Sequence, residues 1–420
     1  MRLIKIATFI CGFGVARASL FLAPILLANL VSTQTYGMLE LAQAMGAVLA
    51  LLFGLGLQGS IPLVLLRSEV LARWDTLLWL ISRIAASCLV VAVVLGVTRG
   101  NAVDLWVLVP LATAVLLLQG LWSITLKSRE QSTRAVFLET GFWMVALLGA
   151  YMAFAGGLGL MVINGALAVY ACLLLAVTWR VMRGVMAPFT RTDLGANIKI
   201  GLPLMFTGIL SLLVASSGRL VLGGTASVAE VGVYAILYRG TALPLVAHQI
   251  LIVGLFRKLF IWDIPVLQRR APVIVFGVTF CALGFWALED VFTVLLGQKF
   301  ADTLAQFRFT GYIILFQTIL WSAIALNDLL VARLQIAGRV VYATASYIGV
   351  TLPLLAFHTW QSNTPFETFA QGYAAVMLGY YCTQCLAIWW QGHWYPRLWF
   401  STLGCFVVCV FGTYYLYGTA

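Results

Sequence analysis

Four arginines lie inside long apolar stretches of this 420-residue sequence, where a positive charge is unexpected. They are Arg17, Arg83, Arg219 and Arg239. A charged side chain at the centre of a bilayer costs about 2.5–3.5 kcal/mol on the insertion scale, so each arginine needs water, a partner or an anionic ligand. Guanidinium groups bind phosphate through paired, charge-assisted hydrogen bonds. The four arginines are therefore candidate contacts for an anionic substrate.

The depth of each arginine separates the candidates. Arg17 lies about 17 Å into its stretch at 1.5 Å per residue, near mid-membrane, and a structural ion pair is its alternative role. Arg239 lies about 10 Å deep by the same rise, and the nearby Pro244 is a candidate hinge because proline weakens the helical hydrogen-bond ladder. Arg219 and Arg83 lie nearer the ends of their stretches. Both can reach the interface with their long side chains, which is the alternative for them.

Three carboxylates also fall within apolar stretches: Glu40, Glu139 and Asp328. A carboxylate at a cavity edge can change protonation when it loses water, so these are candidates for ion coupling. All three lie near the ends of their stretches, where an interfacial or paired role is the alternative. Gln43 shares a helix face with Glu40, one turn away. His248 is a weaker candidate, because a lone histidine in a membrane is as often a hydrogen-bonding group between helices.

Motifs for other chemistry are missing from the sequence. It holds no P-loop and no glycine-rich nucleotide fingerprint. The pair Cys382 and Cys385 lies in mid-stretch, where packing is favoured over a metal or redox site, and the eight cysteines predict no disulfide framework. We therefore expect a protein that is not an enzyme and holds neither cofactor nor metal. Energy must come from an ion gradient, a partner protein or the substrate gradient.

The composition decides which elements position these side chains. The chain is 62% hydrophobic and 9% charged with a mean hydropathy of +1.01, whereas about a quarter of the residues in soluble domains are charged. A chain that crosses a bilayer must be helical or a closed barrel, and long apolar runs without alternation favour helices. The candidate spans are 6–31, 38–66, 77–98, 104–126, 135–155, 160–179, 200–222, 232–256, 271–288, 309–331, 340–357, 369–391 and 398–417.

The expected fold is an all-α polytopic membrane protein with two similar six-helix lobes, 12–14 helices in all. Residues 1–197 form the first lobe, 198–392 the second, and 393–420 an additional C-terminal helix. Residues 180–199 are the expected linker, followed by a helix start at Gly201-Leu202-Pro203, since proline suits a first helical turn. The segment 289–308 is amphipathic and is expected to lie in the membrane interface.

Lysine and arginine predict the orientation. Segments that would share the side of the N-terminus hold 18 of these residues, and the opposite segments hold three. The three are Arg99, Lys299 and Arg308. By the positive-inside rule the N-terminus is cytoplasmic. The net charge of +11 thus follows from topology, and no nucleic-acid partner is needed to explain it.

Short motifs recur at corresponding places in the two halves. A turn at Ser32–Gly37 separates two spans, and a similar turn precedes Glu-Val-Gly-Val-Tyr at 230–234. With Gly-Leu-Pro at 201–203 and Leu-Leu-Gly-Gln-Lys-Phe at 295–300, this order resembles the O-antigen and exopolysaccharide flippases of the multidrug/oligosaccharidyl-lipid/polysaccharide exporter superfamily. The departure is the thirteenth span, because the simplest members have twelve and others fourteen.

The resemblance implies a flippase in the bacterial inner membrane. It would carry polyprenyl-pyrophosphate-linked oligosaccharide for lipopolysaccharide or exopolysaccharide synthesis, by alternating access of two lobes around a cationic cavity. Its partners would be membrane lipids, a polysaccharide polymerase and a chain-length regulator. One alternative is an ion-coupled multidrug or cation antiporter, for which an acidic cavity is expected. The other is a polysaccharide polymerase or ligase, for which a large outward loop is expected.

Overall fold

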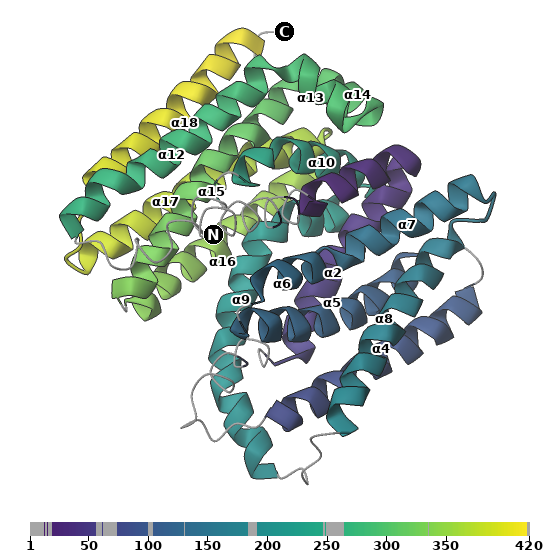
Figure 1. The fold of residues 1–420 in the computed structure, drawn as a ribbon. Coiled ribbons are helices and arrows are strands. Elements are labelled where there is room, and N and C mark those ends of the chain that lie inside the picture. The colour runs from purple at the N-terminus through teal and green to yellow at the C-terminus, as the bar shows by residue number, and fades with distance from the viewer. Residues whose placement is uncertain are drawn as a thin grey trace, which may run out of the picture. The chain divides into compact units, whose positions relative to one another are not determined.

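The computed structural model describes residues 12, 15, 19–55, 61, 74–99, 104–129, 131–183, 191–246, 248, 264–334 and 336–417, and every regular element among them is a helix (Figure 1). A short helix, Ser19–Leu30, comes first. The labelled helices are α2 (Thr33–Phe53), α4 (Trp74–Arg99), α5 (Leu105–Ser128), α6 (Ser132–Glu139), α7 (Gly141–Ala155), α8 (Met161–Arg183), α9 (Arg191–Thr225), α10 (Val228–Thr241), α12 (Ile264–Ala287), α13 (Glu289–Leu296), α14 (Gln298–Gln306), α15 (Arg308–Leu334), α16 (Ala337–Gln361), α17 (Pro365–Trp390) and α18 (Pro396–Tyr417).

Many of these helices are long and apolar enough to cross a bilayer. Within the described residues nine pass on length and composition, and ten if the bent pair α6–α7 is one span. Large apolar side chains cover their outer faces, among them Val97, Phe280 and Tyr415. Such continuous apolar surface is unfavourable in water and normal in lipid. The prediction of an all-α polytopic membrane protein is confirmed.

The chain forms two compact units, Met1–Gly223 and Gly224–Ala420. In the first unit α5 is the central helix and packs against α2, α4 and α8. Its contact with α2 is close, because a methyl group added to Gly46 would lie 2.8 Å from the Cβ of Ala112. Small residues allow membrane helices to approach in this way.

The expected span 135–155 is bent in the structure. Helices α6 and α7 meet at Thr140 with a 50° bend. Gln119 of α5 donates from Nε2 to the Leu138 carbonyl at 2.7 Å, which satisfies a backbone group beside the break. A side chain on Gly141 would collide with the hydroxyl of Tyr170 and the Gln119 amide, so glycine is required at this contact.

In the second unit α15 is the central helix, with α10, α12, α17 and α18 against it. Figure 1 shows α12, α15 and α18 lying side by side in this unit. Trp399 of α18 donates to the Asn327 side-chain oxygen of α15 at 3.3 Å. The predicted additional C-terminal helix is therefore part of the packed body of its unit.

The stretch between α12 and α15 consists of two short helices, α13 and α14, joined at Gly297 with φ of 95°. A positive φ of this size favours glycine. Phe300 of α14 is buried, while Val294 of α13 is exposed. The stretch is amphipathic, as expected, and its location in the membrane interface stays a prediction.

Helix α9 begins earlier than the sequence indicated. It starts at Arg191, so Gly201-Leu202-Pro203 lies inside a helix and the expected helix start there is wrong. A proline inside a membrane helix is tolerated where neighbouring groups satisfy the freed backbone. Most of the expected linker 180–199 is consequently helical, at the end of α8 and the start of α9. The lobe boundary at residue 197 stays a prediction, since lobes are defined by how they move.

Candidate functional site

Helix α2 presents a polar face built by its first turns. Ser32 caps the helix, accepting a hydrogen bond from the Thr35 backbone N–H at 3.1 Å. One turn apart on the same face lie Tyr36 and Glu40. The Tyr36 hydroxyl donates to Glu40 Oε1 at 2.7 Å. Glu40 is 0% exposed, so its charge requires compensation inside the protein.

That compensation comes from Arg219 of α9. Its Nη1 lies 2.9 Å from Glu40 Oε2 and also donates to Gln43 Oε1 at 2.8 Å. A third bond runs from Nη2 to Ser216 Oγ at 3.3 Å. Arg219 is 7% exposed, so both charges of this ion pair are buried. We call Tyr36, Glu40, Gln43, Ser216 and Arg219 the α2–α9 cluster.

A glycine allows the two helices of this cluster to approach. A methyl group on Gly223, one turn beyond Arg219, would lie 2.6 Å from the Leu41 Cδ1 atom. The sequence placed Glu40 and Arg219 in different roles, ion coupling and anion binding. The structure instead pairs them across 179 positions of the chain. Single-sequence reasoning offered no signal for this pairing.

Arg83 has a different environment. It lies about two turns inside the membrane span of α4, its side chain is exposed, and its guanidinium stacks over the Trp79 ring at 5.4 Å. Trp79 is four residues toward the start of α4, so the side chain follows the helix in that direction. Arg83 makes no ion pair with any residue that the structure describes.

Arg83 also lines a groove of about 760 Å³ between α2, α4 and α5. We call this the α4 groove. Its lining is almost entirely apolar and includes Phe53 of α2, Val91 and Leu95 of α4, and Trp106 of α5. The groove belongs to the first unit alone.

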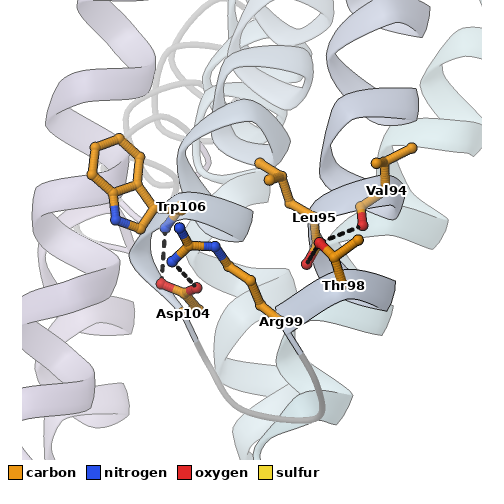
Figure 2. Close-up of polar contacts among 6 residues, drawn as sticks. All are labelled: Val94, Leu95, Thr98, Arg99, Asp104 and Trp106. Carbon is orange, nitrogen blue, oxygen red and sulfur yellow. Dashed lines mark hydrogen bonds and ion pairs between the residues drawn. The ribbon is translucent and has the colours of Figure 1, made fainter.

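Beyond Leu95 and Trp106, which line the α4 groove, the end of α4 and the start of α5 are joined by polar contacts (Figure 2). Arg99 donates to Asp104 Oδ2 at 3.1 Å, and Asp104 Oδ1 caps α5 by accepting from the Trp106 N–H at 3.1 Å. Arg99 also stacks on the Trp106 ring at 6.0 Å. These contacts fix the position of Trp106. Arg99, the cation drawn in Figure 2, is neutralised by the Asp104 carboxylate.

Glu139 lies at the end of α6, beside the bend. It accepts a hydrogen bond from Ser123 Oγ at 2.6 Å and forms an ion pair with Lys127. Both partners are on α5. The carboxylate therefore ties the broken span to α5, which is the paired role that the sequence left as an alternative.

The remaining candidates lie in the second unit, except Arg17, which is outside the described residues. Arg239 is buried in α10, and Pro244 follows the end of that helix at Thr241. Asp328 of α15 accepts from Gln384 Nε2 of α17 at 2.6 Å. His248 and Ser322 Oγ form a buried hydrogen bond of 2.8 Å. The helix-linking role suggested for His248 is thus present, while anion binding by Arg239, ion coupling by Asp328 and the Pro244 hinge stay predictions.

Metal chemistry finds no support in the described part of the chain. No group of three or more histidine, cysteine or acidic side chains there can hold a metal ion. Cys382 and Cys385 are free thiols, and the Cys385 sulfur accepts a hydrogen bond from the Asn327 amide.

Comparisons with known proteins give the fold. No family model and no curated protein matches the sequence. The chain is similar to the structure of lipid II flippase MurJ in an inward closed conformation, with a TM-score of 0.64, 12% identity and coverage of 100% of this chain and 93% of that chain. A structure described as protein A gives a TM-score of 0.61 at 13% identity, covering 94% and 96%. An inward-facing multidrug resistance MATE family transporter gives 0.48 at 14%, covering 89% and 93%. The described part of the chain therefore shares its fold with this flippase structure.

Proposed function

We propose that the protein is a flippase that moves polyprenyl-pyrophosphate-linked oligosaccharide across the bacterial inner membrane for surface polysaccharide synthesis. The observation that carries the proposal is Arg83, an exposed guanidinium about two turns inside the span Thr76–Arg99 that makes no ion pair with the described residues and borders an apolar groove. A cation placed in this way needs water, the membrane interface or an anionic ligand to compensate it, and the apolar groove beside it suits a ligand with an anionic head and an apolar chain. The shared fold with a lipid II flippase agrees with this function.

The physical need for such a protein comes from the sugar. Each hydroxyl taken unpaired into hydrocarbon costs about 4–8 kcal/mol, so an oligosaccharide does not cross a bilayer unaided. A protein that alternates between inward- and outward-open states supplies a polar route for the headgroup. The prenyl chain meanwhile stays in contact with apolar surface.

The α2–α9 cluster suits a coupling role in this cycle. Arg219 is held by Glu40 in the described state, so a pyrophosphate that reached it would compete with the carboxylate. Protonation of Glu40 would cancel the carboxylate charge and free the guanidinium for phosphate. The proton and the anionic headgroup would then bind together, which couples transport to a proton gradient.

A cation antiporter is the second candidate, and Asp328 favours it. This carboxylate has an amide partner in Gln384 and no ion pair with a described residue. The first unit disfavours a cation antiporter, because its buried carboxylate Glu40 is already paired with Arg219. We therefore rank the flippase first.

A cellular experiment distinguishes the two candidates. Removal of the gene from its native host should deplete the surface polysaccharide and leave lipid-linked oligosaccharide on the cytoplasmic face of the membrane. The wild-type gene should restore export, and Arg83→Gln should restore it poorly. Normal polysaccharide in the deleted strain, together with a new sensitivity to cationic drugs, would support the antiporter instead.

A further inference from the structure

One face of α4 lines the α4 groove from Arg83 to Leu95. Arg83, Ser87, Val91 and Leu95 follow one another at intervals of four, which places them on the same helix face, and all four line the groove. Its opposite wall comes from α2, with Phe53, and from α5, with Trp106. The groove thus has a cation at one end and mostly apolar side chains along the rest, with the hydroxyls of Ser87 and Thr113 among them.

The length of the groove restricts what can occupy it. Arg83 and Leu95 are about 18 Å apart along the helix at 1.5 Å per residue. One leaflet of the hydrocarbon core is about 15 Å deep, half of the usual 30 Å. An apolar chain that follows the groove from the guanidinium onward therefore reaches past the middle of the bilayer.

The charge restricts the occupant further. The Arg83 side chain turns toward Trp79, away from the apolar part of the groove, and the indole ring supports the guanidinium from one side. The edge of the guanidinium stays available for a planar pair of hydrogen bonds, which phosphate oxygens match. An oligosaccharide or peptide would find too few polar partners along the apolar lining.

We infer that the α4 groove binds the prenyl chain of a polyprenyl phosphate or pyrophosphate, with the phosphate at Arg83. The inference rests on the proposed function and adds where the lipid part of the substrate lies. With a cytoplasmic N-terminus, the Arg83 end of α4 is the cytoplasmic one, so the phosphate enters from the cytoplasmic leaflet. An ordinary phospholipid chain is the competing occupant, and it spans a single leaflet.

Photocrosslinking at two neighbouring positions tests the inference. Val91 lines the groove and is 48% exposed, whereas Val90 lies outside it and is 63% exposed. Each is replaced by p-benzoylphenylalanine, and the full-length protein is reconstituted in phosphatidylethanolamine–phosphatidylglycerol vesicles with a trace of radiolabelled polyprenyl phosphate. Simple contact with bulk lipid predicts more capture at position 90. The groove predicts the reverse.

Three further variants, combined with the probe at position 91, separate charge from shape. Arg83→Gln should lower capture of polyprenyl phosphate about ten-fold, as expected for the loss of a charge-assisted hydrogen bond. Arg83→Lys should keep part of the capture, because the charge remains and the planar fork is lost. Ser87→Phe keeps the charge, fills the groove one turn above it, and should also lower capture.

The outcomes distinguish this inference from the proposed function. Equal capture at positions 90 and 91 would overturn the assignment of the prenyl chain to the α4 groove. Capture of radiolabelled phosphatidylglycerol at position 91 as efficient as that of polyprenyl phosphate would overturn it as well. A protein that still flips lipid-linked oligosaccharide in that case keeps its proposed function. Selective, Arg83-dependent capture at position 91 supports the groove, and if such a protein flips nothing, only the flippase proposal fails.

Discussion

Removing either charge of the Glu40–Arg219 pair should destabilise the first unit strongly. The pair is 2.9 Å long, Glu40 is fully buried, and Arg219 has three hydrogen bonds within the α2–α9 cluster. Loss of Glu40 leaves the Arg219 charge buried without its carboxylate, and loss of Arg219 removes the guanidinium from a fully buried carboxylate, each at a cost of about 3–5 kcal/mol. For a unit of 223 residues, that cost corresponds to a fall in Tm of about 6–20 °C.

The assay compares single and double variants. Glu40→Gln and Arg219→Gln should each lower the Tm of the detergent-solubilised protein, measured by the loss of the monodisperse peak on size-exclusion chromatography after heating. The double variant should recover most of the loss, because neither amide carries a charge and Tyr36 keeps an acceptor. Arg99→Gln is the matched control: its pair with Asp104 is exposed, so the effect should stay below about 1 kcal/mol.

Two results would refute this reasoning. Single variants within a degree or two of the wild type would mean that the charges are not buried together. Losses that add in the double variant would mean that the two side chains do not interact. A recovered double variant that has also lost the dependence of transport on a proton gradient would support the coupling role of Glu40.

Three other predictions concern the bend, the topology and Arg17. Gly141→Ala should destabilise the protein by about 1–3 kcal/mol and lower its Tm, because the added methyl group collides with Tyr170 and Gln119. Gly165→Ala is the control and should leave the Tm unchanged, because its methyl group would meet no atom within 4 Å. Equal Tm values for the two variants would show that the bend needs no glycine. In a background without native cysteines, Ala226→Cys should react with an impermeant thiol reagent in intact cells and Ala187→Cys should not; the opposite labelling would reverse the orientation. Arg17→Ala should abolish surface polysaccharide at near-normal protein abundance, with partial recovery in Arg17→Lys, and normal export by an inserted Arg17→Ala protein would remove this residue from the site.

The sequence was a good guide to the helices because the bilayer allows few alternatives. Each expected span coincides with at least part of a described helix, from Ser19–Leu30 to α18. The local features that failed depend on distant groups. The bend at Thr140 is stabilised by Gln119 of another helix, and the proline of α9 misled because its helix had already begun at Arg191.

The candidate site, like the fold, was predictable from the sequence only in part. Which side chains are charged inside the membrane is evident from the sequence, but which of them compensate one another is a matter of tertiary contact. Glu40 and Arg219 show this, since 179 positions separate them. Arg83 shows the converse. The interval of four that joins it to Ser87 and Val91 was visible in the sequence, although only the groove gives that pattern a meaning.

The most direct test of the account is a flipping assay with purified protein in proteoliposomes. A fluorescent polyprenyl-pyrophosphate-linked oligosaccharide is placed in both leaflets, and the fraction reached by a membrane-impermeant quencher is followed over time. The account predicts that the wild-type protein makes the inner-leaflet pool accessible, that a proton gradient changes the rate, and that Arg83→Gln slows it. An inner pool that stays protected with correctly folded protein, as in protein-free vesicles, would contradict the central claim.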